Sequence, residues 1–114
     1  MSERSTQRAI RHYLAARGYQ SVHVPNGAVL QGDENARKRQ MGILKGDGLM
    51  VGFPDLLVYG KGGRIGHIEV KGEGAKQQDS QKAVQAWMGD WGHNYAVCRS
   101  IEDATETLEK WGWK

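Results

Sequence analysis

Three residues between positions 52 and 71 have side chains that together suit a metal-assisted reaction: Asp55, Glu69 and Lys71. Asp55 begins one short apolar run, and Glu69 and Lys71 end the next. The glycine-rich turn at residues 60–63 predicts a hairpin between the runs, which would bring Asp55 close to Glu69. Because side chains alternate along a strand, Glu69 and Lys71 point to one face. Two carboxylates beside an amine suit a hard divalent cation such as Mg²⁺ or Mn²⁺.

Each half of this pattern is common alone. Glu-x-Lys is usually a solvated strand face, and Pro-Asp is ordinary turn chemistry. The combination is more specific: residues 52–56 read Gly-Phe-Pro-Asp-Leu, a hairpin follows, and residues 69–72 read Glu-Val-Lys-Gly. This arrangement resembles the PD-(D/E)xK nuclease superfamily. Within it, the motifs are most similar to the VRR-NUC family, the virus-type replication-repair nucleases, in their stand-alone phage or bacterial form.

The resemblance implies a metal-dependent DNA endonuclease. In that interpretation Asp55 and Glu69 bind Mg²⁺ or Mn²⁺, and the carbonyl of Val70 is a neutral ligand. Lys71 orients the attacking water and stabilises the negative charge that develops on the phosphate. A glutamate on the first helix commonly adds a carboxylate in this family, and Glu3 is the acidic residue in position to match it, although an acid there also simply complements the helix dipole.

Gln81 matches a glutamine that the family carries early in the helix after Glu-x-Lys. It lies one turn before Val84 on the expected buried face, where an apolar residue would continue the stripe. An exposed helix start explains a polar residue there equally simply. In the interpretation that follows from the resemblance, Gln81 positions water or Lys71.

The composition predicts one domain over residues 1–114. The chain is 39% hydrophobic and 25% charged, which is ordinary for a soluble protein. No apolar run approaches the length of a membrane span, no nucleotide-binding loop is present, and no histidine or cysteine spacing indicates zinc. The single cysteine, Cys98, lies in an apolar segment, which favours packing and a reducing, cytoplasmic setting in a bacterial or phage-infected cell. The net charge of +3 is compatible with a polyanionic partner.

The expected fold class is α/β, a restriction-endonuclease-like core in which helices flank a small mixed sheet in the order α-β-β-β-α-β-α. Ser2 and Gly18 predict the ends of a first helix over residues 2–17. The remaining predicted elements are a strand at 19–24, an optional short helix from Asp33 through Leu44 within a polar region, strands at 55–59 and 64–71, a helix at 79–91, a strand at 94–99 and a last helix capped by Ser100.

The densest basic run is Arg37-Lys38-Arg39. Such a run is either a solvated helix face or, beside a nuclease site, a phosphate clamp. The predicted DNA-binding residues are Arg37, Lys38, Arg39, Lys45, Lys76 and Lys82.

Stand-alone VRR-NUC domains resemble Holliday-junction resolvases and tend to be homodimers, so the resemblance implies a homodimer that cuts branched DNA. Two alternatives are a different nuclease of the superfamily, restriction-type or RNA-directed, and a non-catalytic DNA-binding module. The presence together of Asp55, Glu69 and Lys71 argues against the second.

Overall fold

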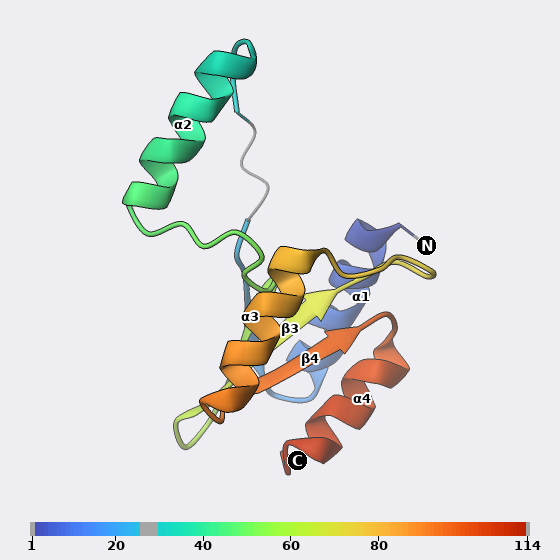
Figure 1. Ribbon diagram of the computed structural model, residues 1–114. Helices are drawn as coiled ribbons and strands as arrows, with labels where there is room; N and C mark the ends of the chain where they lie inside the picture. The colour runs from blue at the N-terminus through green and yellow to red at the C-terminus, as the bar shows by residue number, and fades with distance from the viewer. Residues whose placement is uncertain (1, 26–29, 114) are drawn as a thin grey trace.

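The computed structural model describes residues 2–25 and 30–113 of the chain. Its elements follow the order α1 (Glu3–Ala16), β1 (Gln20–His23), α2 (Glu34–Gly46), β2 (Leu56–Gly60), β3 (Arg64–Val70), α3 (Asp79–Asp90), β4 (Asn94–Cys98) and α4 (Ile101–Lys110) (Figure 1). The predicted α/β class and the mixed sheet flanked by helices are confirmed.

The four strands form one sheet in the order β1-β2-β3-β4. The first three are antiparallel neighbours, whereas β3 and β4 are parallel. A parallel pair needs a crossover connection, and α3 provides it. The register pairs Leu56 with Ile68, so the residue before β2, Asp55, lies at the same end of the sheet as Glu69.

The hydrophobic core lies between one face of the sheet and the helices α1 and α4. It contains Ile10 and Leu14 from α1, together with Leu56, Val58, Ile68, Val70, Cys98, Ala104, Leu108 and Trp113. Alternation then directs the side chains of His67 and Glu69 to the opposite face, on the side of α3. Cys98 is fully buried, and burial raises the pKa of its thiol to about 11, which agrees with a packing role.

The helix ends follow the predicted signals. Ser2 caps α1 by accepting a hydrogen bond from the Ser5 N–H, and Gly18 follows the helix with a φ of 88°. Residues 34–46, which the expected element order did not count as a helix, form α2, and Asp33 caps it by accepting from the Ala36 N–H at 2.8 Å.

Helix α2 projects away from the body of the molecule (Figure 1). It has no buried residue, and in the part of the chain that is described no other helix or strand packs against it. Ile43 on this helix is 65% exposed. An isolated helix of this length is marginally stable in water. Among the described helices and strands, α2 has no packing partner that would stabilise it.

Candidate active site

The two carboxylates predicted from the sequence meet at the end of the β2–β3 hairpin. Asp55 immediately precedes β2, and its Oδ2 accepts a hydrogen bond of 2.8 Å from the backbone N–H of Val70. This bond fixes Asp55 against the end of β3. Its carboxylate also hydrogen-bonds the side chain of Glu69. The structure therefore brings Asp55 and Glu69 together as the hairpin predicts.

Glu69 is the most constrained group of the site. Its side chain is 1% exposed, and its Oε2 is buried without a hydrogen-bond partner. Burial first, and then the hydrogen bond and charge of Asp55, raise the pKa of Glu69 from its usual 4.5 to about 9, although the Lys71 ammonium opposes the shift. At neutral pH Glu69 therefore holds a proton that it shares with Asp55.

A divalent cation fits this arrangement, because it would replace the shared proton and give the orphaned Oε2 a partner. Within residues 2–25 and 30–113, no three His, Cys, Asp or Glu side chains lie close enough to bind an ion by themselves. The remaining ligands would then be main-chain and water oxygens. An all-oxygen donor set with few carboxylates is typical of Mg²⁺.

Lys71 follows β3 and continues the face that carries Glu69. It is 7% exposed, and its backbone N–H donates to the carbonyl of Cys98 at 3.0 Å. Main-chain pairing between β3 and β4 thus extends to Lys71 and fixes its position. The ammonium acts on Glu69 strongly enough to oppose the rise in that group's pKa. Acid and amine are therefore close neighbours in a nearly dry site.

Glu3 lies at the margin of the site. It is exposed in the first turn of α1, and together with Asp55 and His23 it lines a cavity of about 530 Å³. Its charge contributes to the raised pKa of Glu69, as the last of the contributing causes. The family resemblance implies that Glu3 adds a carboxylate to the metal site, and the structure places Glu3 at the cavity that Asp55 also lines.

Gln81 is the third residue of α3, and its Oε1 accepts a hydrogen bond of 2.8 Å from the Gln78 N–H. The amide oxygen therefore caps the helix. The start of α3 is set against the Asp55 loop by Gly52, which has a φ of +87°. A Cβ at Gly52 would lie 2.4 Å from the Ser80 carbonyl oxygen. The glycine of Gly-Phe-Pro-Asp thus allows the close approach of these two segments.

Replacing Gly52 by alanine is expected to destabilise the protein by about 2 kcal/mol or more, because a left-handed backbone and a backbone clash both oppose the new Cβ. The separation of α3 from Asp55 should also reduce cleavage in the protein that remains folded. Thermal denaturation measures the first effect and single-turnover cleavage the second. Gly89→Ala is the control, because nothing lies within 4 Å of a Cβ there. Equal melting temperatures for the two variants would contradict this role of Gly52.

Tyr95 and Gln77 belong to the surroundings of the site, although the sequence did not point to them. Register pairs Tyr95 of β4 with His67, which puts both side chains on the α3 side. The Tyr95 hydroxyl accepts a hydrogen bond from the Gln77 Nε2 at 3.2 Å. Burial and then the charge of Glu69 raise the pKa of Tyr95 to about 12. The parallel pairing of β3 with β4 makes this contact, and no local pattern indicates it.

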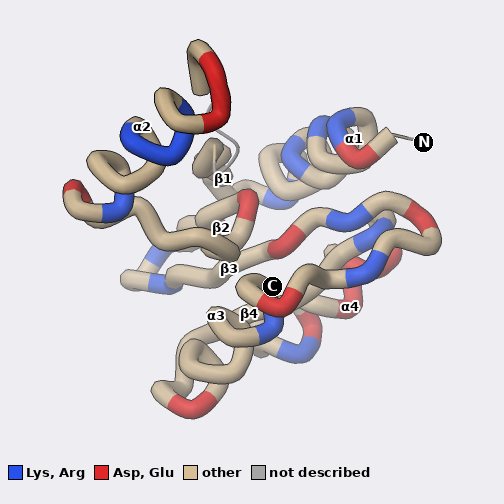
Figure 2. Tube along the Cα trace, turned by 45° about the horizontal axis from the view of Figure 1, so that its top comes forward, with Lys and Arg blue, Asp and Glu red and all other residues tan. Residues whose placement is uncertain are grey.

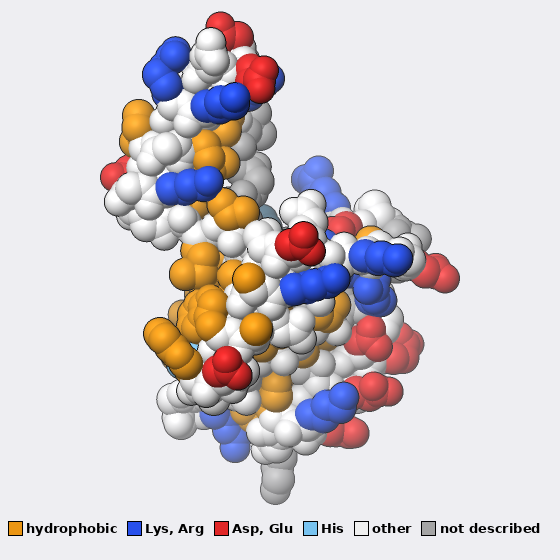
Figure 3. Space-filling model, viewed as in Figure 1, with side chains coloured by type: hydrophobic (Ala, Val, Ile, Leu, Met, Phe, Trp, Pro, Cys, Tyr) orange, Lys and Arg blue, Asp and Glu red, His pale blue; other side chains and the backbone are white. Residues whose placement is uncertain are grey.

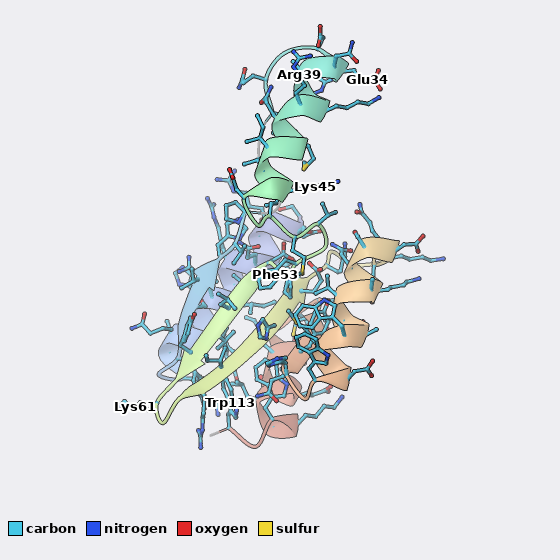
Figure 4. All side chains as sticks on the ribbon, turned by 60° about the vertical axis from the view of Figure 1, so that its left-hand side comes forward. Glu34, Arg39, Lys45, Phe53, Lys61 and Trp113 are labelled. Carbon is cyan, nitrogen blue, oxygen red and sulfur yellow. The ribbon has the colours of Figure 1, made fainter. Side chains whose placement is uncertain are left out.

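The predicted DNA-binding residues fall into two groups. Arg37, Lys38, Arg39 and Lys45 are exposed on α2, where Figure 4 shows Arg39 near the far end of the helix and Lys45 near its base. Lys38 forms a 3.4 Å ion pair with Glu34. Lys76 and Lys82 are exposed around the start of α3. The second group therefore flanks the start of α3, which packs against the Asp55 loop at Gly52, whereas the first lies on a helix that no other described element contacts.

The structure thus places two neighbouring carboxylates and a buried lysine at the end of a hairpin, in a small mixed sheet between helices. The model of the VRR-NUC domain matches residues 1–102 of the 114-residue chain. The chain belongs to the VRR-NUC family and is a nuclease of the PD-(D/E)xK superfamily, for which DNA is the implied substrate. A comparison with curated proteins gave no match. None of the described helices is long and apolar enough to cross a membrane.

Proposed function

We propose that this chain, acting as one domain over residues 1–114, is a Mg²⁺- or Mn²⁺-dependent DNA endonuclease that works as a homodimer on branched DNA. The contact of Asp55 with the buried Glu69, beside Lys71, is the observation that supports the chemistry best. Burying the Glu69 carboxyl group, whose Oε2 has no hydrogen-bond partner, costs folding free energy that a purely structural role does not explain. Its cost is explained if the pair binds a cation.

Asp55 and Glu69 are the proposed cation ligands, with the Val70 carbonyl beside them and Glu3 at the margin, directly or through water. A bound divalent cation neutralises charge on the scissile phosphate and lowers the pKa of a water ligand. The Lys71 ammonium orients the attacking water and stabilises the charge that develops on the phosphate oxygens. The Gln81 amide keeps its NH₂ group for positioning water, since its oxygen caps α3.

Uncovered apolar surface supports the proposed dimer. On the α3 side of the sheet, Val22, Tyr59 and Ile65 are 49%, 40% and 47% exposed. Trp91, at the end of α3, is 73% exposed. Figure 3 shows hydrophobic side chains gathered between the base of α2 and the edge of α3. Large apolar patches on small proteins usually mark interaction sites, and a second copy would cover both this face and the unpartnered α2.

The direct test incubates the protein with a four-way DNA junction, a linear DNA duplex, a DNA single strand and an RNA strand, each with Mg²⁺, Mn²⁺ or EDTA. We expect cleavage that requires the metal and is fastest on the junction, where paired nicks appear within one binding event. Sedimentation at micromolar concentration should give twice the chain mass. A monomer that cuts linear duplex as fast as the junction would contradict the dimer and the preference, and cleavage of RNA alone would favour the RNA-directed alternative.

The basic run on α2 gives a separate prediction. Replacing Arg37, Lys38 and Arg39 together by alanine should weaken DNA binding and flatten its salt dependence by up to ~2.7 units, about 0.9 for each lost phosphate contact. Mn²⁺ binding should not change, because these residues lie on a helix separate from the carboxylates. Fluorescence anisotropy across a salt series measures the slope. An unchanged slope would identify the run as an ordinary solvated face.

A further inference from the structure

We propose that the exposed face of α1 binds the phosphate backbone of the DNA strand that enters the active site. The binding groups are Arg4, Arg8 and Arg11, here called the α1 arginine row. This inference rests on the proposed function for its substrate. It assigns the strand-binding surface to α1, whereas the densest basic run lies on α2.

The spacing of the row puts its three side chains on one stripe. At 100° per residue, positions 4, 8 and 11 fall within an arc of about 60°. With a rise of 1.5 Å per residue, the row is about 10 Å long. The buried stripe, which contains the fully buried Ile10 and Leu14, lies roughly 110° around the helix from the centre of the row. Packing of that stripe against the sheet therefore fixes the direction in which the arginines point. Figure 2 shows the basic stretches repeated along α1, with an acidic stretch near its N-terminal end.

The row opens onto the same cavity as the candidate metal ligands. The cavity of about 530 Å³ is lined by Glu3, by Asp55 and by all three arginines, with Gln7 and His23 completing it. Acidic and basic groups therefore share one hollow. This pattern suits a phosphodiester strand, because a cation between the carboxylates would bind the scissile phosphate while the neighbouring phosphates meet arginine.

The guanidinium groups of the row are not neutralised by carboxylates. Among the residues that the structure describes, Lys38–Glu34 is the one salt bridge. Arg11 donates from Nε to the Ser21 hydroxyl at 3.1 Å and from a terminal nitrogen to the Ser21 carbonyl at 3.3 Å, which ties it to β1. Arg4 and Arg8 make no such side-chain hydrogen bond in the described structure. The N–H groups of their planar guanidinium groups can therefore donate to phosphate oxygens.

The position of the row predicts which part of the strand it holds. It begins one residue after Glu3 and runs along α1 toward β1, so it extends from the carboxylates in one direction only. Its length of about 10 Å corresponds to the axial rise of about three nucleotides of one strand. The row therefore binds the phosphates on a single side of the scissile bond and sets the position of the cut strand.

The test compares Arg4→Gln/Arg8→Gln with a control that removes the same charge elsewhere, Lys61→Gln/Arg64→Gln. Figure 4 shows Lys61 at the hairpin tip, at the opposite end of the molecule from α2, and both control residues line a different cavity. DNA binding is measured by anisotropy in Ca²⁺ over a salt series. The row variant should lose roughly 10- to 60-fold in affinity at 0.1 M salt and about 1.8 units of slope, from 0.9 per contact. Its Mn²⁺ affinity should stay within about twofold of wild type, because no residue of the row is a proposed cation ligand.

A second measurement identifies the contacted phosphates. Neutral methylphosphonates placed one at a time along the strand should weaken wild-type binding on one side of the cut, and the same substitutions should have little further effect on the row variant. Equal losses for the row variant and the control, or additive effects of methylphosphonates and arginine removal, would overturn the proposal. If wild type binds DNA but cuts no form of it, the proposed function fails, while these binding measurements still decide whether the row holds the strand.

Discussion

Replacing Glu69 by glutamine is expected to abolish cleavage and to make the metal-free protein more stable at neutral pH. Cleavage should fall by at least ~10³-fold, since an amide cannot supply the charge that a divalent cation requires. The gain in stability arises because glutamine imitates the protonated acid, and its NH₂ group can still donate to Asp55. The variant thus keeps the contact without the cost of taking up a proton at a pH above the group's usual pKa.

The pH dependence of this effect follows from the pKa of Glu69, which is raised from 4.5 to about 9. Below about pH 4.5 the carboxyl is neutral in both the folded and the unfolded chain. Between these values the folded chain holds a proton that the unfolded chain releases, so the free energy of unfolding of wild type falls as pH rises. Glu69→Gln should not show this loss, and at pH 8 it should be more stable by on the order of 2 kcal/mol, roughly 8 °C in melting temperature.

Thermal denaturation in EDTA from pH 4 to pH 9 measures the difference. Glu73→Gln is the control, because Glu73 is an exposed carboxylate close by in the chain. A variant whose advantage does not grow with pH would show that Glu69 is ionised in the metal-free protein. Calorimetry gives an independent check, because Mn²⁺ binding to wild type near pH 7 should release about one proton.

Replacing Lys71 by alanine is expected to slow the chemical step by roughly 10²–10³-fold while Mn²⁺ still binds, because the lysine acts on the water and the transition state. Single-turnover cleavage at saturating DNA and Mn²⁺ measures the rate, and calorimetry measures the metal. The ammonium also lowers the pKa of Glu69, so the variant should need a higher pH than wild type to bind the metal fully.

Lys71→Arg should restore only part of the rate, since a planar guanidinium cannot occupy the space of a compact ammonium in a site that is 7% exposed. Lys110→Ala, which removes an exposed lysine from the last turn of α4, is the control. If Lys71→Ala lost metal affinity and rate in equal proportion at high pH, the lysine would be a structural support for the carboxylates instead.

The parts of the site that the sequence predicts correctly depend on local rules. Alternation along a strand and a glycine-rich turn suffice to bring Asp55 opposite Glu69 and to put Lys71 on the same face. Tyr95 could not be predicted in this way, because its position depends on a parallel pairing made across the whole of α3. Gly66 is similar: a Cβ there would lie 2.2 Å from the Trp111 ring, a neighbour far away in sequence.

The basic residues also show that closeness in the sequence does not predict which side chains share a surface. Three consecutive residues such as Arg37-Lys38-Arg39 attract notice in a sequence, yet on a helix they spread over about 200°. Arginines spaced as Arg4, Arg8 and Arg11 are inconspicuous in the sequence but share one stripe. The cavity that they line is formed by α1, the end of β1 and the start of β2, so only the tertiary structure joins them to Asp55.

Because no described element packs against α2, this helix should unfold locally more often than the rest of the described fold. The amide hydrogens of α2 are protected by that helix's own hydrogen bonds alone, because no described strand or helix covers it. They should exchange with solvent far faster than those of β2 and β3, which open only when the core does. Trypsin should accordingly cut first after Arg37, Lys38 or Arg39 and leave the remaining fold intact. If α2 binds a partner, either DNA or a second copy of the chain, its amide hydrogens should exchange more slowly and its trypsin sites should be cut more slowly.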